Sequence, residues 1–255
     1  MKILLTGYKG FIGSHLLTAL EKEGHFVDVY EWGQILPSVM EQDWVIHVGA
    51  ISATTEKDIE KVLTQNYDFS VQLYNACKFY EVNFQYASSA SVYGLNREFN
   101  EESPVDPRTP YAWSKYLFER YVKLHPANYS IAQGFRYFNV YGSGEGHKGS
   151  QASPFTQFAN QYKETGKVKL FTGSGTMLRD FVPVEQVVKT HLDFLKVKES
   201  GVWNVGTGTT KSFLDVAKSV APESSFEFVS MPENLINSYQ YYTCADMSKT
   251  IKTLS

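Results

Sequence analysis

The sequence contains little cysteine, no long apolar run and no block of charge of one sign. Its 255 residues include two cysteines, Cys77 and Cys244, which show none of the spacings of a metal site. We therefore expect free thiols in a reducing cytoplasm and no bound metal. No apolar run approaches the ~20 residues that span a bilayer, and the first apolar stretch, residues 3–5, is too short for a signal peptide. The net charge of −3 argues against a nucleic-acid or membrane-surface role.

A turn rich in glycine is the first motif that the sequence does contain. Residues 3–6 have the pattern of a buried strand, and Gly7, Gly10 and Gly13 follow before an amphipathic helix. Gly7 permits a tight turn, Gly10 lets backbone N–H groups approach a pyrophosphate, and Gly13 lets the helix pack closely on the strand. The helix N-terminus then faces the phosphate charge. This layout predicts a dinucleotide site.

An acidic residue ends the second predicted strand, residues 26–30. A carboxylate at this place, Glu31, binds the adenosine ribose hydroxyls and favours NAD over NADP. The alternative is a solvated acid at a strand end. Only residues 32–43 separate Glu31 from the next predicted strand, 44–48, where a full fold usually fits a helix and another strand. The sequence thus predicts an α/β fold with a Rossmann-type doubly wound parallel sheet, short of one strand.

Two further strand ends carry small and polar residues. Residues 49–52 follow the 44–48 strand, and Ser89 follows a strand at 82–87, with a long helical stretch at about 56–80 between them. Ligands bind α/β sheets at the carboxyl ends of strands. Serines there either form turns or hydrogen-bond a substrate hydroxyl. A strand at 130–138 then leads into a glycine-rich segment, 139–150, which reads as an irregular loop that crosses between lobes.

Tyr111 and Lys115 lie four positions apart in a predicted helix. Thr109 is a suitable N-cap, Pro110 suits the first helical position, and the helix must end near residues 125–126. The spacing places both side chains on one helix face, where a lysine ammonium lowers the tyrosine pKa. Titration near neutrality needs a shift of ~3 units, and therefore a desolvated, charged setting.

Two basic residues further along have two interpretations each. Lys148 is either solvated or, in a cleft, an acid/base whose pKa falls on desolvation. Arg179, close to a glycine-rich turn, either contacts a phosphate with two hydrogen bonds or pairs with a local carboxylate.

Together, the glycine turn, the Ser89 region, the Tyr111/Lys115 pair and residues 136–139 resemble the extended short-chain dehydrogenase/reductase superfamily and its NAD-dependent epimerase/dehydratase family. Residues 49–56, residues 134–141 with 145–150, and residues 169–174 with 179–182 resemble the ADP-L-glycero-D-manno-heptose 6-epimerases. The resemblance implies a dinucleotide-binding domain over 1–142, to which 180–206 returns, and a mainly substrate-binding lobe over 143–255.

The resemblance also implies roles for individual residues. Tyr111 and Lys148 would be acid/bases on opposite faces of the sugar carbon, Lys115 would hold the nicotinamide ribose and tune Tyr111, and Ser89 would bind the reacting hydroxyl. The cofactor site would comprise Gly7, Gly10, Phe11, Ile12, Gly13, Glu31, Val48, Gly49, Ala50, Ile51, Ser52, Asn66, Lys115 and Val140. The substrate site would comprise Ser89, Asn139, Ser150, Gln157, Phe171, Thr172, Gly173, Ser174, Arg179 and Tyr239, with Gln157 standing where the family has a histidine.

The implied reaction is epimerisation of an ADP-heptose-like nucleotide sugar by a homo-oligomer. The sugar would be oxidised transiently at C6, and hydride would return to the other face. NADP is the family's usual cofactor, but the lysines that bind its 2′-phosphate have no counterpart here, so NAD and NADP both remain open. Another nucleotide-sugar 4-epimerase, a reductase and a non-catalytic dinucleotide-binding protein are the alternatives. A 4,6-dehydratase would need an acidic pair where Ala90 and Ser91 stand.

Overall fold

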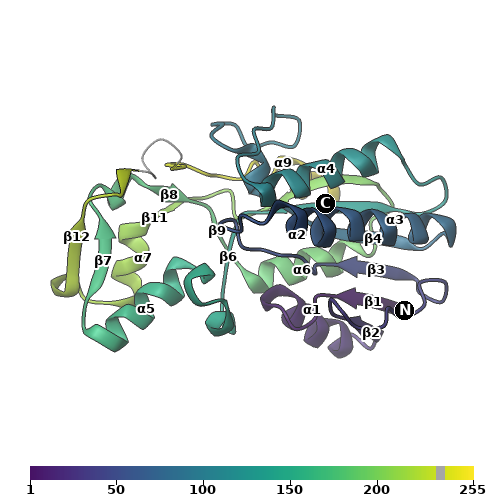
Figure 1. The fold of residues 1–255 in the computed structure, drawn as a ribbon, viewed down its shortest axis with the longest axis horizontal. Helices are drawn as coiled ribbons and strands as arrows, with labels where there is room; N and C mark the ends of the chain where they lie inside the picture. Colours follow the sequence, from purple (N-terminus) through teal and green to yellow (C-terminus); the bar gives the residue numbers. More distant parts are fainter. Residues whose placement is uncertain (234–238) are drawn as a thin grey trace.

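A six-stranded parallel sheet forms the larger end of the molecule (Figure 1). The computed structural model describes residues 1–233 and 239–255. The sheet has the order β10-β5-β4-β3-β1-β2 and consists of β1 (Lys2–Thr6), β2 (Phe26–Tyr30), β3 (Trp44–His47), β4 (Asn83–Ser89), β5 (Ala132–Tyr137) and β10 (Gly201–Val205). The predicted α/β class is confirmed. In the described ranges β2 is an edge strand, as the short 32–43 segment predicts, and Phe26 on it is 77% exposed.

Helices cover both faces of this sheet, which explains the nearly continuous apolar sequence of β1. On one face lie α1 (Phe11–Lys22) and α6 (Val184–Phe194); on the other lie α2 (Ile59–Val62), α3 (Phe69–Phe79) and α4 (Pro110–Leu124). Leu4 packs in the cluster with Leu73 and Phe118, whereas Ile3 and Leu5 pack in the cluster with the helix α1 side chains. Alternate residues of one strand therefore serve two cores.

The helical stretch predicted over about 56–80 is interrupted. It begins at Ile59, passes through a π-helical turn at Leu63–Asp68 and continues as α3. Such turns insert an extra residue into a helix and are frequent at functional sites. Here the turn includes Asn66, which is buried.

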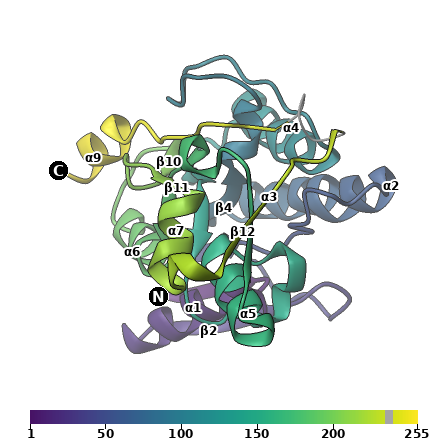
Figure 2. The same ribbon diagram turned by 90° about the vertical axis from the view of Figure 1, so that its left-hand side faces the viewer.

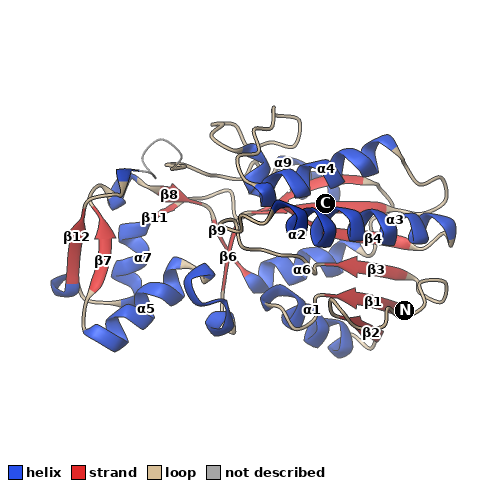
Figure 3. Cartoon of the chain, in the orientation of Figure 1, coloured by secondary structure: helices blue, strands red, loops and turns tan. Residues whose placement is uncertain are grey.

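A smaller group of elements lies at the opposite end of the molecule (Figures 1 and 3). It contains the parallel strands β7 (Val168–Phe171) and β12 (Phe226–Val229) and the helices α5 (Pro154–Thr165) and α7 (Phe213–Val220). Figure 2 shows α5, α7 and β12 in front of the sheet. Their core includes Phe158, Leu170 and Val216. Whether the domains divide as the sequence suggests stays a prediction.

Short strands connect the two ends. The parallel pair β6 (Asn139–Tyr141) and β9 (Phe181–Pro183) and the antiparallel pair β8 (Leu178–Arg179) and β11 (Lys211–Ser212) lie between them. The prediction of an irregular loop over 139–150 is therefore wrong in part, because β6 pairs with β9 and residues 145–151 form 3-10 turns. The last helix, α9 (Ser248–Leu254), returns to β10, where Trp203 Nε1 donates to Thr253 Oγ1 at 3.0 Å. No helix in the described ranges is long and apolar enough to span a membrane.

Candidate functional site

The glycine turn leaves almost no space for side chains. Gly7 has a left-handed backbone (φ +75°), and a Cβ there would lie 2.4 Å from the Cα of Gly49. A Cβ at Gly13 would lie 2.0 Å from the carbonyl oxygen of Gly7. Both approaches are much closer than the ~3.5 Å at which carbon atoms pack. The Gly10 N–H donates to Gly7 O at 3.0 Å, which closes the turn where α1 begins.

A pocket of about 90 Å³ opens beside this turn. It is lined by Thr6, Gly7, Tyr30, Glu31, Trp32, Gly49, Ala50, Ile51, Gln65 and Phe69. Glu31 Oε2 accepts a hydrogen bond from Lys9 N at 3.2 Å. The Trp32 ring meets Phe69 edge-on, with centroids 5.5 Å apart. The pocket thus brings together the glycine turn, the strand-end acid and the loop after β3.

Tyr111 and Lys115 lie one turn apart on α4. The predicted helix start is confirmed, since Thr109 Oγ1 accepts from Ala112 N at 3.1 Å and Pro110 is the first helical residue. Lys115 Nζ lies 5.8 Å from the Tyr111 ring centroid, and Lys115 is only 5% exposed. Ser89, the last residue of β4, lies close enough to the Tyr111 hydroxyl to affect its pKa.

Burial dominates the titration of this pair. It raises the pKa of Tyr111 above the usual value, while the nearby Ser89 hydroxyl lowers it. The lower tyrosine pKa expected from Lys115 is wrong for the protein alone, because loss of water disfavours the phenolate. Burial also lowers the pKa of Lys115 to about 8, against the opposing effect of Glu119. Tyr111 is thus a neutral phenol at pH 7 that can donate a proton.

Asn66 fixes the loop after β3 to α4. Its Oδ1 accepts from Ile51 N at 2.8 Å, and its Nδ2 donates to Ile51 O at 3.0 Å and to Ser114 Oγ at 3.2 Å. Ser114 Oγ in turn donates to Tyr111 O at 2.7 Å. The Asn66 side chain, which the resemblance places in the cofactor site, therefore uses its hydrogen bonds to fix the backbone of Ile51.

His47 is a buried residue that the sequence reasoning missed. Its Nδ1 lies 2.6 Å from Thr6 Oγ1 and its Nε2 2.8 Å from Ser70 Oγ. Burial, and secondarily the charge of Lys115, lower the pKa of His47 to about 3. The imidazole is therefore neutral and links β1 to α3 beneath the glycine turn. Its position after apolar residues in a strand gave no signal for this role.

The Lys148 side chain packs against Phe11, the first residue of α1, and does not extend into open solvent. Its Nζ is 5.0 Å from the Phe11 ring centroid and 3.9 Å from Glu145 Oε2. Burial lowers the pKa of Lys148, and Glu145 opposes this. His15 Nε2 on α1 also lies 2.9 Å from Ser143 O. The segment that carries Lys148 therefore closes against the glycine turn.

Glu145 is the buried centre of that segment. It is 1% exposed and accepts hydrogen bonds from Gly142 N, Ser153 N, Ser153 Oγ and Thr156 Oγ1. Gln157 also supports the segment, because its Nε2 donates to Ser150 O at 3.2 Å and Ala152 O at 2.6 Å.

Arg179 is buried without a carboxylate partner among the ion pairs of the described residues. Its guanidinium carbon lies 5.6 Å from the Phe213 ring and 5.3 Å from the Tyr239 ring, and Nη1 donates to Leu178 O at 3.0 Å. Phe171 packs edge-on against Tyr239 with centroids 6.4 Å apart. The alternative of a local carboxylate pair is therefore not seen, and the remaining donors suit an external anion.

The other predicted site residues surround these groups. Val140 and Asn139 lie on β6, Thr172 and Gly173 follow β7, and Ser174 is buried, with an Oγ for which the described residues provide no partner. Val48 and Ser52 flank the lining residues Gly49, Ala50 and Ile51, and Ile12 follows Phe11 in α1. Their roles stay predictions.

Asp180 is a second buried residue that the sequence reasoning missed. It is fully buried, and its carboxylate accepts from Thr207 N at 2.8 Å, Gly208 N at 3.0 Å and Ala245 N at 3.0 Å. It thereby ties the loop after β10 to the strand that carries Arg179. An acid directly after Arg179 was the one available signal.

Several known proteins are similar to this chain in sequence and in fold. Residues 28–206 match the NAD dependent epimerase/dehydratase family. The structure of Helicobacter pylori ADP-L-glycero-D-manno-heptose-6-epimerase is 28% identical, with a TM-score of 0.87 over 99% of this chain and 89% of that chain. A mutant of Bacillus cereus UDP-glucuronic acid 4-epimerase, in complex with UDP-4-deoxy-4-fluoro-glucuronic acid and NAD, is 26% identical, with a TM-score of 0.82 over 100% and 93%.

A third similar structure is Thermus thermophilus UDP-glucose 4-epimerase in complex with NAD. It is 26% identical, with a TM-score of 0.80 over 99% of this chain and 92% of that chain. The resemblance and the Rossmann-type fold drawn from the sequence are confirmed. The matched residues span most of the chain, and it belongs to the NAD-dependent epimerase/dehydratase family.

Proposed function

We propose that this protein is a nucleotide-sugar epimerase that uses NAD and acts on an ADP-heptose-like substrate. One observation carries the proposal: Tyr111 lies beside the Ser89 hydroxyl and has the buried Lys115 beside its ring. Asn66 joins this helix to the loop that lines the pocket at the glycine turn. An acid/base and a dinucleotide cradle are thus neighbours.

The residues present fit a dinucleotide. The steric demand for glycine at positions 7 and 13 leaves the backbone N–H groups of the turn and of α1 open to a pyrophosphate. Glu31 would bind the adenosine ribose and repel a 2′-phosphate, which supports NAD over NADP. When bound, NAD supplies a reversible acceptor for hydride from the sugar carbon.

The chain's own side chains supply proton transfer. Tyr111 exchanges a proton with the reacting hydroxyl, Ser89 orients that hydroxyl, and Lys115 places positive charge beside the phenol. Inversion of a carbon centre presents the sugar in two orientations: in one an acid/base accepts the hydroxyl proton as hydride leaves the carbon, and in the other an acid/base donates a proton to the ketone oxygen as hydride returns. Lys148 is the second group, supported by its lowered pKa and its contact with Phe11.

The nucleotide part of the substrate is expected beside Arg179, on the side of the smaller group of elements. Arg179 would pair with the diphosphate, because it is a buried cation with donors to spare between two aromatic rings. Tyr239 and Phe171 would pack against the nucleotide.

A UDP-sugar 4-epimerase is the second candidate. Two of the similar structures are UDP-sugar 4-epimerases, at 26% identity each, close to the 28% of the heptose enzyme. Both candidates would use Tyr111 as an acid/base, and they differ in the sugar carbon that is inverted.

A substrate panel distinguishes the candidates. The purified protein is incubated with each C6 epimer of ADP-glycero-manno-heptose, with UDP-glucose and with UDP-glucuronic acid, and products are separated by chromatography. We expect interconversion of the heptose epimers, its loss in Tyr111→Phe, and NAD in the mass spectrum of the bound cofactor. Conversion of a UDP-sugar alone would establish the second candidate. Conversion of none by a protein that retains its cofactor would refute both.

A further inference from the structure

A third side chain continues the column formed by Tyr111 and Lys115 on α4. Glu119 lies one turn beyond Lys115 and is 6% exposed. A carboxylate is rarely buried to this degree without partners. Residues four apart on a helix are neighbours on one face. Glu119 therefore lies one turn from Lys115, just as Lys115 lies one turn from Tyr111.

Two neighbouring strands hold the Glu119 carboxylate. Arg136 on β5 donates from Nε to Oε1 at 3.0 Å and from Nη2 to Oε2 at 2.6 Å. Ser88 on β4 donates to Oε1. The next residue of β4 is Ser89, which lies beside the Tyr111 hydroxyl. Consecutive residues of one strand are thus neighbours of both ends of the column.

The charges of this pair act on Lys115 with opposite sign. Glu119 raises the pKa of Lys115 against the effect of burial, and Arg136 neutralises part of the Glu119 charge. The titratable or charged groups that face Lys115 and the pair are Tyr111 and Glu119 on α4, His47 on β3, Tyr86 on β4, Tyr93 in the 3-10 turn after β4, Glu101 in the loop before α4, and Arg136 on β5.

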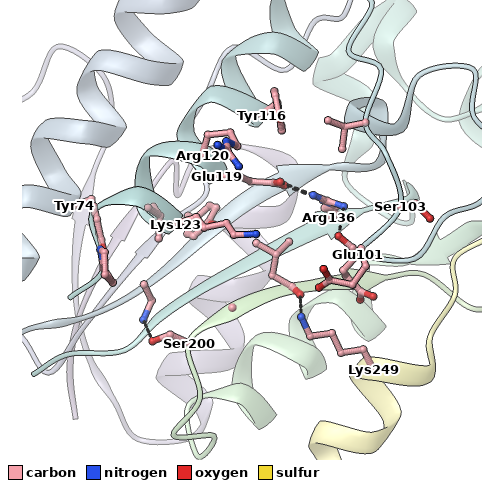
Figure 4. A pocket seen from close by; sticks show the side chains of 18 of the residues that line it. Tyr74, Glu101, Ser103, Tyr116, Glu119, Arg120, Lys123, Arg136, Ser200 and Lys249 are labelled. Carbon is pink, nitrogen blue, oxygen red and sulfur yellow. Dashed lines mark hydrogen bonds and ion pairs between the residues drawn. The ribbon is translucent and has the colours of Figure 1, made fainter. Parts of the chain in front are cut away.

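The outer side of the pair borders a cavity of about 520 Å³ (Figure 4). Figure 4 shows Glu119 and Arg136 joined at its wall, with Lys123, Lys249 and Glu101 around it. The cavity lining drawn from the described residues includes neither Tyr111 nor Lys148, so this space is separate from the proposed reaction site. The Glu119–Arg136 pair therefore lies between Lys115 and the cavity.

We propose that Glu119 is a positioning residue for Lys115: its carboxylate, one helical turn away and held in place by Ser88 and Arg136, keeps the lysine charged beside Tyr111, to a degree set by Arg136. The inference deepens the proposed function, because it depends on Lys115 as the group that serves Tyr111 and the cofactor. A salt bridge that served only stability would leave the titration of Lys115 unchanged.

The test compares Glu119→Gln with Arg136→Gln, and uses Glu102→Gln, an exposed residue of the same cavity, as control. The pKa of Lys115 is measured by NMR of ¹³C-labelled lysine, with its resonance assigned by Lys115→Arg. We expect a fall of about 1 unit in Glu119→Gln, a rise in Arg136→Gln and no change in the control. Shifts in the same direction, or none, would overturn the proposal.

Kinetics give a second readout. Activity falls as the pH rises through the Lys115 pKa, so the alkaline limb of the kcat profile should move to lower pH in Glu119→Gln and to higher pH in Arg136→Gln. Where a glutamine variant does not fold, Glu119→Asp is measured in its place. Aspartate moves the negative charge away from Lys115 and should therefore give a smaller fall in the Lys115 pKa. An unchanged Lys115 pKa in this variant refutes the proposal. The NMR titration needs no substrate, so failure of the proposed function is seen separately, as absent turnover.

Discussion

Replacing Glu145 with glutamine should disable the segment that carries Lys148 while the sheet stays folded. The Glu145 carboxylate accepts hydrogen bonds from Gly142 N at 3.0 Å and from Ser153 Oγ at 2.8 Å, and Ser153 N donates to its second oxygen. Glutamine keeps the volume but turns one acceptor into a donor. A buried N–H or hydroxyl then faces an NH₂ group.

The structure sets the size of the effect. Hydrogen bonds to a charged group contribute ~1.5–3 kcal/mol each, and an unsatisfied buried donor costs ~1–3 kcal/mol. A loss of about 3 kcal/mol for the segment is a factor of ~100 in the population that closes over the glycine turn. Loss of the Glu145 charge also removes the effect that opposes the lowered pKa of Lys148.

We therefore expect kcat of Glu145→Gln to fall about 100-fold at pH 7.5, with a fall in Tm of only a few degrees. Steady-state kinetics and circular dichroism measure both. Glu56→Gln is the control, since its ion pair with Lys61 is partly exposed and contributes little. Wild-type kcat in Glu145→Gln, or a loss of the whole fold, would refute the reasoning.

Three further perturbations have expected outcomes. Tyr111→Phe should lower kcat at least ~1,000-fold while cofactor affinity, measured by fluorescence titration, stays within a few-fold; normal turnover would exclude Tyr111 as acid/base. Arg179→Gln should raise KM for the nucleotide sugar ~10–100-fold with little change in kcat, whereas an unchanged KM would remove Arg179 from the substrate site. Burial lowers the pKa of His47 and of His191 to about 3, below the ~6.5 of the unfolded chain. Stability that is present above pH ~6.5 should therefore be lost as the pH falls, by roughly 3 kcal/mol per pH unit between about pH 6 and 4. Urea unfolding at several pH values measures this, and His191→Gln should halve the slope.

Local signals in the sequence predicted much of the fold. The cap at Thr109 and the proline after it mark where α4 begins, and the alternation of turn, strand and helix gives the parallel sheet. The steric need for glycine at Gly7 and Gly13 is visible in the spacing alone, because both serve a turn of fixed geometry. The short segment after Glu31 left no room for a further strand, and β2 is accordingly an edge strand of the described sheet.

Contacts between distant elements could not be predicted. The π-helical turn follows from the bonds of Asn66 to residues on two other elements, and no helix propensity encodes them. Burial of Tyr111 depends on what packs over α4, so the direction of its pKa shift was beyond spacing arguments. Glu119 did have a signal, since it extends the four-residue spacing of Tyr111 and Lys115, but its partner Arg136 is on a separate strand.

Transfer of a deuterium atom tests whether this protein epimerises a sugar by transient oxidation. ADP-heptose labelled with deuterium at C6 is converted to equilibrium in ordinary water, and both epimers are analysed by mass spectrometry. Oxidation and return of the same hydrogen within the closed site predicts full retention of deuterium in the product epimer. Replacement of the deuterium by solvent hydrogen during epimerisation would show that a proton, not a hydride, leaves the carbon, and would contradict the proposed reaction.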